Sequence, residues 1–172
     1  MVRLRFFLPY DVSMRVSILT LSDSVANGKY EDRSGPAVLQ RCIELKWEAV
    51  KCTVLPDDRA AIETFLKQTA DSDSVDLILT TGGTGLGPRD VTPEATMAVS
   101  DRLIPGFPEQ MRAAGAKKTS RAILSRAAAG IRGKTIILNL PGSPKGAVDS
   151  LDAVAELLPH AVAVVHGAHH QC

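Results

Sequence analysis

The stretch LTTGGTGLGPRDVTPE, Leu79 to Glu94, places four glycines within six residues directly after an apolar run. This order is typical of a turn that leaves a buried strand, and Thr92-Pro93 predicts the start of the next helix. A turn of this kind needs one glycine for a positive φ angle, so four glycines indicate main-chain N–H groups that approach an anion closely. We therefore predict a ligand cradle formed by Gly82, Gly83, Thr84 and Gly85.

Two familiar phosphate-binding motifs do not match this loop. A P-loop requires GxxxxGK[ST]; Gly82 and Gly87 have that spacing, but Pro88-Arg89 replaces the lysine and the hydroxyl residue. A dinucleotide fingerprint requires GxGxxG, and Pro88 stands where its third glycine should be. The loop is therefore predicted to bind an anion through its backbone, without either motif's specific contacts.

The segments around this loop alternate between strand and helix patterns. Apolar, β-branched runs at 16–21, 49–55, 75–81 and 135–140 predict strands, and amphipathic patterns between them predict helices. This order favours an α/β fold, a three-layer α/β/α sandwich with a mostly parallel central sheet. We predict one domain over residues 14–172. Residues 1–13 are expected to be an N-terminal extension that is either disordered or precedes the true start at Met14.

A second loop, like the first, connects a predicted strand to a predicted helix. Asn139-Leu140-Pro141-Gly142-Ser143-Pro144 leaves a predicted strand and opens a predicted helix, with Ser143 as N-cap and Pro144 at the first helical position. Ordinary capping explains this loop equally well when it is taken alone. Two such loops at the carboxyl edge of one parallel sheet would, however, form a cleft with two anion sites.

Two acids follow predicted strands at the same edge. Asp57 comes directly after one strand, where an N-cap role and a functional role have equal weight, whereas Asp90 is harder to explain as a cap because Thr92 is better placed. Two carboxylates beside two anion sites would repel a phosphate unless a divalent cation lay between them. Magnesium takes such oxygen ligands together with substrate phosphates. Asp57 and Asp90 are therefore the predicted Mg²⁺ ligands and catalytic residues, in a site for phosphoryl or nucleotidyl transfer.

The overall composition is not that of a nucleic-acid-binding or membrane protein. The 172 residues carry a net charge of +1 and no basic cluster, and no apolar run approaches the length of about 18 residues that predicts a membrane span. The three cysteines have no CxxC spacing, so neither a disulfide framework nor a zinc ribbon is supported. We expect a cytoplasmic protein with reduced thiols.

Three stretches carry a resemblance to a known family: TTGGTGLGPRDVTPEAT, LSRAAAGIRGKTIILNLPGSPKG and LTLSDS…EDRSGPA. They resemble the Mog-type molybdopterin adenylyltransferases, and they are similar to the G domain of gephyrin and to MoaB-type proteins. The resemblance runs from Met14 to Ala161. It implies the Mog/MoaB-like fold of molybdenum cofactor biosynthesis, a homotrimer, and the Mg²⁺-dependent transfer of AMP from ATP to molybdopterin with release of pyrophosphate. It also implies a molybdenum-insertase partner.

The resemblance assigns roles to individual residues. Asp57 and Asp90 match the essential acids of the family, and more weakly matched positions are Asp23 and Ser34. The positions that match ligand-contacting residues are Thr84, Ser125, Asn139, Pro141, Gly142 and Ser143. Gly115 departs from the family, in which a serine is frequent at this position. This departure keeps open an alternative, a MoaB-type molybdopterin-binding or carrier protein without adenylyltransferase activity.

Overall fold

The computed structural model describes residues 13–168, so the predicted extension at 1–13 lies outside the described residues except for Ser13. No helix among residues 13–168 combines the length and apolar character needed to span a bilayer. In chain order the elements are β1 (Arg15–Leu21), α1 (Asp23–Ala26), α2 (Ser34–Glu44), β2 (Glu48–Leu55), α3 (Arg59–Asp71), β3 (Leu77–Thr81), α4 (Thr92–Val99), β4 (Arg102–Leu103), α5 (Gly106–Ala116), the 3₁₀ helix η1 (Ser120–Leu124), β5 (Ala129–Arg132), β6 (Thr135–Leu140), α6 (Pro144–Asp152) and α7 (Leu158–Val165).

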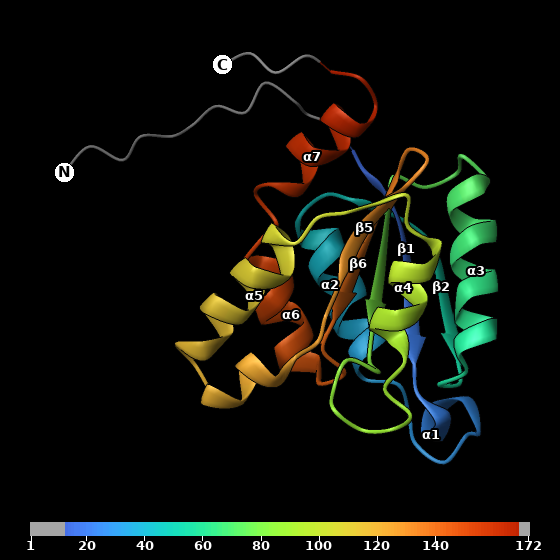
Figure 1. Ribbon diagram of the computed structural model, residues 1–172, viewed down its shortest axis with the longest axis vertical. Helices are drawn as coiled ribbons and strands as arrows, with labels where there is room; N and C mark the ends of the chain where they lie inside the picture. Colours follow the sequence, from blue (N-terminus) through green and yellow to red (C-terminus); the bar gives the residue numbers. More distant parts are fainter. Residues whose placement is uncertain (1–12, 169–172) are drawn as a thin grey trace.

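The strands form one sheet in the order β2-β1-β3-β6-β5-β4 (Figure 1). The first four strands in this order pair in parallel, whereas β5 runs antiparallel to both β6 and β4. The predicted mostly parallel sheet is confirmed. Because neighbouring parallel strands end at the same edge, the loops after β2, β1, β3 and β6 all leave the sheet side by side.

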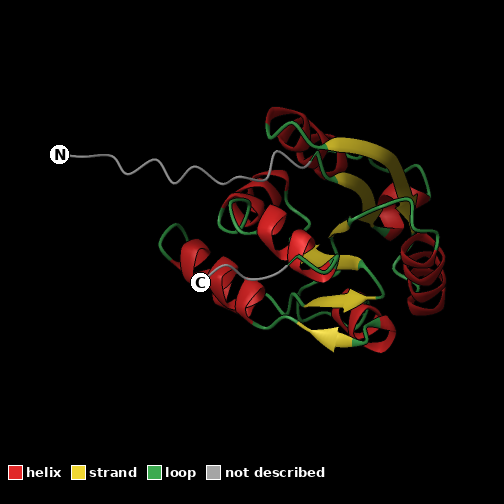
Figure 2. Cartoon of the chain, turned by 90° about the horizontal axis from the view of Figure 1, so that it is seen from above, coloured by secondary structure: helices red, strands yellow, loops and turns green. Residues whose placement is uncertain are grey.

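Helices cover both faces of the sheet, as the view from above shows (Figure 2). β3 is buried at all five positions and divides its side chains between the two faces. Leu77 and Leu79 pack into a cluster with residues of α2, α5, α6 and α7, and Ile78 packs into a second cluster with residues of α3 and α4. A strand covered on both faces reads as a continuous apolar run, which explains its sequence and confirms the three-layer sandwich.

Two short neighbouring strands at one end of the sheet order were not predicted. β4 has only two residues and β5 four, and the β5 sequence AGIR carries little β propensity. Gly130 in β5 has a packing reason: a Cβ there would lie 2.1 Å from the Ser100 Oγ atom. The Ser100 side chain thus occupies the space beside this strand, and only glycine leaves room for it.

Candidate active site

The first two glycines of the loop after β3 are required by the backbone. Gly82 and Gly83 have φ angles of +108° and +62°, a region that other residues rarely adopt. A Cβ on Gly82 would also lie 2.2 Å from the Leu21 carbonyl oxygen. The chain therefore turns sharply at the end of β3 against the end of β1. Within residues 13–168, the amides that follow, those of Thr84, Gly85 and Leu86, donate no hydrogen bond.

The other two glycines make room for a carboxylate. A Cβ on Gly85 or Gly87 would lie 2.9 or 2.8 Å from the Asp90 Oδ2 atom. The same Oδ2 accepts a hydrogen bond of 2.7 Å from the Gly87 amide. The loop thus folds back on Asp90 and holds its carboxylate against bare backbone.

Asp57 lies against the same loop and is not a helix cap. The N-cap of α3 is Asp58, which accepts a hydrogen bond of 2.8 Å from the Ala61 amide, so the capping interpretation of Asp57 was wrong. A Cβ on Gly83 would lie 3.2 Å from the Asp57 Oδ1 atom. That buried oxygen has no hydrogen-bond partner among residues 13–168.

Asp57 also makes a reciprocal contact with Asp23. Its Oδ2 accepts a hydrogen bond from the Asp23 amide at 2.9 Å, and its own amide donates to the Asp23 Oδ1 at 3.0 Å. Burial raises the pKa of Asp57, and the negative charges of Asp23 and Asp90 raise that pKa further, against the lowering effect of the Asp23 amide. The surroundings of Asp57 therefore disfavour its ionised form.

Arg89 neutralises the outer member of this acidic group. Its Nε and Nη2 atoms donate to the two oxygens of Asp23 at 3.0 and 2.9 Å. This two-pronged contact lowers the pKa of Asp23. Since Arg89 belongs to the glycine loop, the ion pair joins the loop after β3 to the end of β1.

The arrangement of these acids fits a magnesium ion that is also coordinated by substrate phosphates. No group of three or more His, Cys, Asp or Glu side chains among residues 13–168 forms a metal site by itself. Mg²⁺, however, is usually held by one or two carboxylates, with waters and substrate phosphates completing the shell. The unpartnered Oδ1 of Asp57 and the nearby charge of Asp90 meet that requirement.

The loop after β6 lies directly beside the glycine loop. The Thr81 hydroxyl donates to the Pro141 carbonyl oxygen at 2.7 Å, and a Cβ on Gly142 would lie 3.2 Å from the Gly82 Cα. Ser143 is the N-cap of α6 and accepts a hydrogen bond of 3.2 Å from the Gly146 amide, which confirms its predicted capping role. The positive end of the α6 dipole is therefore placed at the same sheet edge as the cradle.

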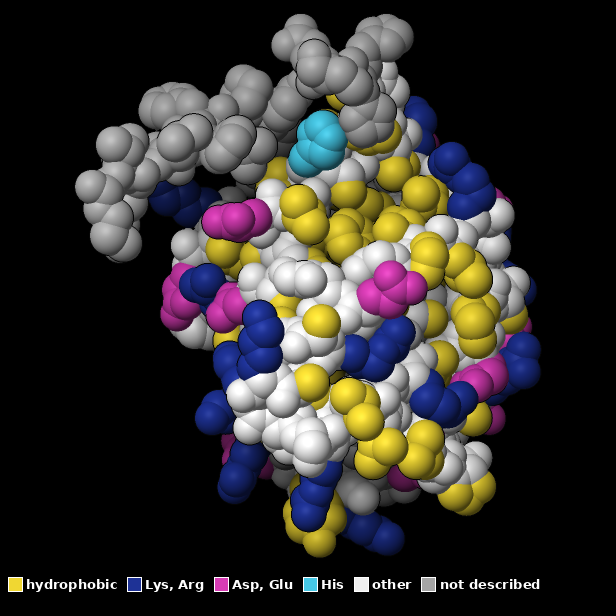
Figure 3. Space-filling view, turned by 60° about the vertical axis from the view of Figure 1, so that its left-hand side comes forward, with side chains coloured by type: hydrophobic (Ala, Val, Ile, Leu, Met, Phe, Trp, Pro, Cys, Tyr) yellow, Lys and Arg dark blue, Asp and Glu magenta, His cyan; other side chains and the backbone are white. Residues whose placement is uncertain are grey.

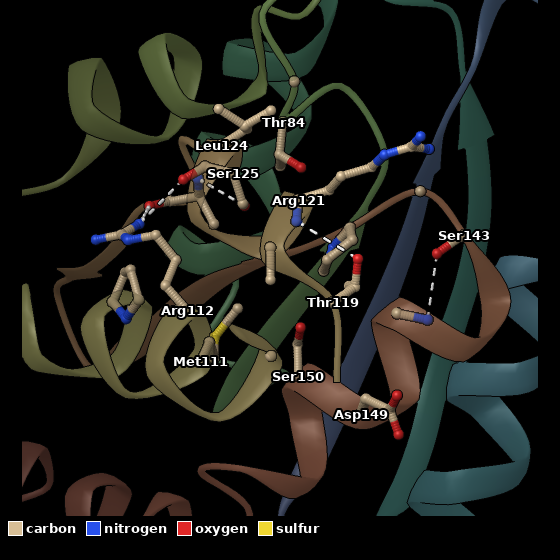
Figure 4. A pocket seen from close by; sticks show the side chains of 18 of the residues that line it. Thr84, Met111, Arg112, Thr119, Arg121, Leu124, Ser125, Ser143, Asp149 and Ser150 are labelled. Carbon is tan, nitrogen blue, oxygen red and sulfur yellow. Dashed lines mark hydrogen bonds between the residues drawn. The ribbon is translucent and has the colours of Figure 1, made fainter. Parts of the chain in front are cut away.

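These loops form one wall of a cavity of about 520 Å³, a volume in the range of small-molecule sites (Figure 4). The opposite wall comes from α5, η1 and the segment that follows η1. The predicted site residues that line the cavity are Gly83, Thr84, Gly85, Asp90, Ser125, Pro141, Gly142 and Ser143. Gly115 lines it too, and a Cβ there would lie 2.7 Å from the Ala122 Cβ. A serine at that position would require this wall to shift.

Comparison with known proteins places the chain in a family. Residues 17–160 match the family model described as "Probable molybdopterin binding domain". The chain belongs to this family. It is 40% identical to the molybdopterin adenylyltransferase of Helicobacter pylori strain J99, covering 92% of each chain, and 41% identical to that of Escherichia coli K12, covering 90% of this chain and 80% of the relative. A crystal structure of MoaB, a molybdopterin biosynthesis enzyme from Thermus thermophilus, shares 48% identity with a TM-score of 0.85, over 90% of this chain and 98% of that one.

Two residues that the family resemblance had singled out lie in the protein interior and not on the cavity wall. Asn139 is fully buried; its Nδ2 donates to the hydroxyls of Thr80 and Thr96 at 3.0 and 2.8 Å, and its Oδ1 accepts from the Ala128 amide at 3.1 Å. Ser34 is 6% exposed and begins α2, where its hydroxyl donates to Asp32 at 3.4 Å. Asn139 thereby connects β6, β3 and α4 beneath the site.

Arg126 organises the glycine loop of this family member, a role that the sequence did not predict. Its Nε donates to the Gly85 carbonyl oxygen at 2.7 Å and its Nη2 to the Asp90 carbonyl oxygen at 2.6 Å. Its Nη1 pairs with Glu94 and lowers the pKa of that carboxyl, and its amide donates to the Thr84 carbonyl oxygen at 2.9 Å. One side chain thus fixes both ends of the segment that presents Asp90. The only sequence signal was its position directly after Ser125.

Proposed function

We propose that this protein transfers AMP from ATP to the terminal phosphate of molybdopterin, releasing pyrophosphate, as a Mg²⁺-dependent step of molybdenum cofactor biosynthesis. The observation that carries the proposal is the convergence of the glycine loop, the α6 start and the Asp57 and Asp90 carboxylates at one sheet edge. The relatives named molybdopterin adenylyltransferase support it, because they match over at least 90% of this chain.

For this reaction the protein must mainly position the two substrates and neutralise their negative charge. The second pKa of a phosphate monoester is near 6, so the attacking phosphate is an anion at neutral pH and needs no general base. Its oxygen forms a bond to the α-phosphorus of ATP, and the bond from that phosphorus to the bridging oxygen breaks, with the electron pair leaving on pyrophosphate. Catalysis then consists of aligning two polyanions and neutralising their charge.

The chain's own residues divide this work. The free amides of Thr84 and Gly85 and the start of α6 at Ser143 would hold phosphate oxygens. Asp57 and Asp90 would hold Mg²⁺, which supplies positive charge to the triphosphate when it is bound. Ser125 and Gly142 line the cavity and would contact the pterin or its phosphate. Asp23 would act indirectly, by fixing Asp57.

The proposed function also implies an oligomeric state, a cellular location and a partner protein. A homotrimer would cover large apolar side chains that are exposed in the single chain: Leu103, Ile123 and Leu157 are 53%, 63% and 54% exposed. Figure 3 shows apolar side chains gathered on one region of the surface, near the height of α7. We place the reaction in the cytoplasm, where ATP is abundant, and expect a molybdenum insertase to receive the adenylylated product.

One assay tests the proposal. Purified protein is incubated with molybdopterin, ATP and Mg²⁺, and pyrophosphate and adenylylated pterin are quantified. Both products should appear in equal amounts. The alternative is a MoaB-type pterin-binding or carrier protein without adenylyltransferase activity, kept open by Gly115, where the family frequently has a serine. Molybdopterin binding without pyrophosphate release would support that alternative and overturn the transferase proposal.

The Asp57→Asn variant should be more stable than the wild type when no metal is present. Burial and the nearby charges raise the folded-state pKa of Asp57 above its ordinary value, so the folded protein disfavours the anion, and stability rises as pH falls through the folded-state pKa. Removing the charge should raise Tm at pH 7 in chelator, because the neutral side chain avoids the burial and the repulsion from Asp23 and Asp90 that raise the pKa of the carboxyl. Saturating Mg²⁺ and a non-hydrolysable ATP analogue should then stabilise the wild type more than the variant. A variant that melts below the wild type in chelator would contradict the account.

The Arg126→Lys variant should need more magnesium. Lysine keeps the positive charge but cannot donate to Gly85, Asp90 and Glu94 from one planar group. The Mg²⁺ concentration for half-maximal AMP transfer should rise about tenfold, equal to a loss of about 1.4 kcal/mol. Arg132→Lys is the control, since Arg132 makes a similar two-pronged pair with Asp71 at 2.8 and 2.7 Å. An unchanged Mg²⁺ requirement in the Arg126 variant would show that Arg126 supports the fold only.

A further inference from the structure

The lining of the cavity combines three kinds of groups. At one end lie the amides of the glycine loop and the Asp90 carboxylate. Apolar side chains, among them Met111, Leu124 and Ala127, also line the cavity. At the other end, α6 presents Asp149 and Ser150, which Figure 4 shows away from Thr84 of the glycine loop. A cavity of this kind fits a flat heterocycle that carries an anionic group at one end and polar N–H groups at the other.

Helix α6 spans the distance between the two polar ends. Ser143 caps its N-terminus beside the glycine loop, and Asp149 follows six positions later. At 1.5 Å per residue this separation is about 9 Å along the helix axis. A bicyclic ring with a short phosphorylated side chain can reach from one end to the other.

Asp149 is available to a ligand at little cost. In the structure its Oδ1 accepts a hydrogen bond of 2.6 Å from the Lys118 Nζ, which comes from the opposite wall of the cavity. The Lys118 side chain is 55% exposed and that of Asp149 is 26% exposed. Exposed ion pairs of this type contribute little to stability, so the carboxylate can exchange its partner. By contrast, Arg112 is committed to the wall, where its Nη1 donates to the Ser125 carbonyl oxygen at 3.2 Å.

We propose that Asp149 selects the pterin ring by accepting hydrogen bonds from its 2-amino and N3–H groups. These two N–H donors lie side by side and match the two oxygens of a carboxylate, the geometry of a charge-assisted bidentate contact. Adenine offers one donor and one acceptor at the equivalent edge, so the same carboxylate disfavours the base of ATP at this end. The inference rests on the proposed function for its ligand class, and it names a specificity-determining residue for that site.

A pair of matched ligands tests this assignment. The probes are neopterin monophosphate and its lumazine analogue, which differ only in that an oxygen replaces the 2-amino group. Fluorescence titration gives the Kd of each. The wild type should bind the pterin about ten- to a hundred-fold more tightly, because the lumazine turns an acceptor toward the carboxylate and leaves it unpaired. Asp149→Asn should reverse or abolish this preference, since its amide offers one acceptor and one donor, which suits the lumazine edge.

Two control variants separate recognition from folding. Asp152→Asn lies on the same helix and loses the ion pair with Arg41 at 2.6 Å, outside the cavity, so it should keep the pterin preference. Lys118→Met removes the partner of Asp149 but keeps the carboxylate, and it should keep the preference as well. Equal loss of both ligands in Asp149→Asn, or an unchanged ratio, would overturn the assignment.

The same variants show which proposal has failed. If AMP transfer to molybdopterin occurs while Asp149→Asn leaves the ligand ratio unchanged, the transferase proposal stands and the Asp149 assignment is wrong. If the Kd ratio changes as expected but no pyrophosphate is released, Asp149 recognises the pterin in a protein that only binds it. The transferase proposal is then wrong.

Discussion

The Asp90→Asn variant should lose about 10²–10³-fold in the rate of AMP transfer and bind molybdopterin within about twofold of the wild type, the scale seen when one charge-stabilising group is removed from an active site. The loop should survive the change, because the asparagine oxygen can still accept the Gly87 amide hydrogen bond now 2.7 Å long. What is lost is the negative charge that would hold Mg²⁺ beside Asp57. Single-turnover transfer rates and equilibrium titration with molybdopterin give the two numbers separately.

The matched control is Asp101→Asn. Asp101 also accepts a backbone hydrogen bond, from Gly133 at 2.8 Å, but it does not line the cavity. This variant should transfer AMP at the wild-type rate. If Asp90→Asn weakened molybdopterin binding as much as it slowed transfer, Asp90 would be a pterin contact and not a metal ligand.

The Gly82→Ala variant should be the most destabilising change in the loop. The φ angle of +108° costs a residue with a Cβ about 1–2 kcal/mol, and the Cβ would lie 2.2 Å from the Leu21 carbonyl oxygen. Displacing backbone in a packed region typically costs a further 1–3 kcal/mol or so. A total of about 3 kcal/mol lowers Tm by roughly 6–12 °C in a domain of this size. Thermal unfolding measures it.

Gly28→Ala separates the two causes of that loss. Gly28 also has a positive φ angle, +69°, but no atom lies within 4 Å of the place where its Cβ would stand. This variant should show the backbone strain alone, about 1–2 kcal/mol. Equal Tm losses in the two variants would mean that the contact between the ends of β1 and β3 relaxes freely, and that Gly82 does not fix the cradle.

The longer strands were predictable from the sequence. β6 has the bounds that its TIILNL run indicates, and β2 differs from the expected segment by one residue. The short strands β4, at one edge of the sheet, and β5, between β4 and β6, were not predicted. Their residues are few and of low β propensity, and they pair because they continue a sheet that the longer strands have already formed. Tertiary context, not local pattern, specifies them.

The candidate site was predictable in its parts and not in its contacts. Glycines and acids after strands marked the correct sheet edge, since parallel strands bring such loops together. The pattern could not show that Asp58, and not Asp57, is the N-cap of α3, because either of two adjacent aspartates fits that position equally well. The pattern also could not show that Asn139 forms hydrogen bonds inside the protein. Strand alternation does not tell which face of the sheet its side chain lies on or that α4 covers that face.

The most direct test of the account is the position of the metal. Crystals of the protein with Mn²⁺ in place of Mg²⁺, a non-hydrolysable ATP analogue and molybdopterin would locate the ion by its anomalous signal. We expect one ion bound by a carboxylate oxygen from each of Asp57 and Asp90, at about 2.0–2.2 Å, the range for Mg²⁺-type oxygen ligands, with the nucleotide phosphates completing its shell. An ion bound to the nucleotide but out of reach of both carboxylates would contradict the account.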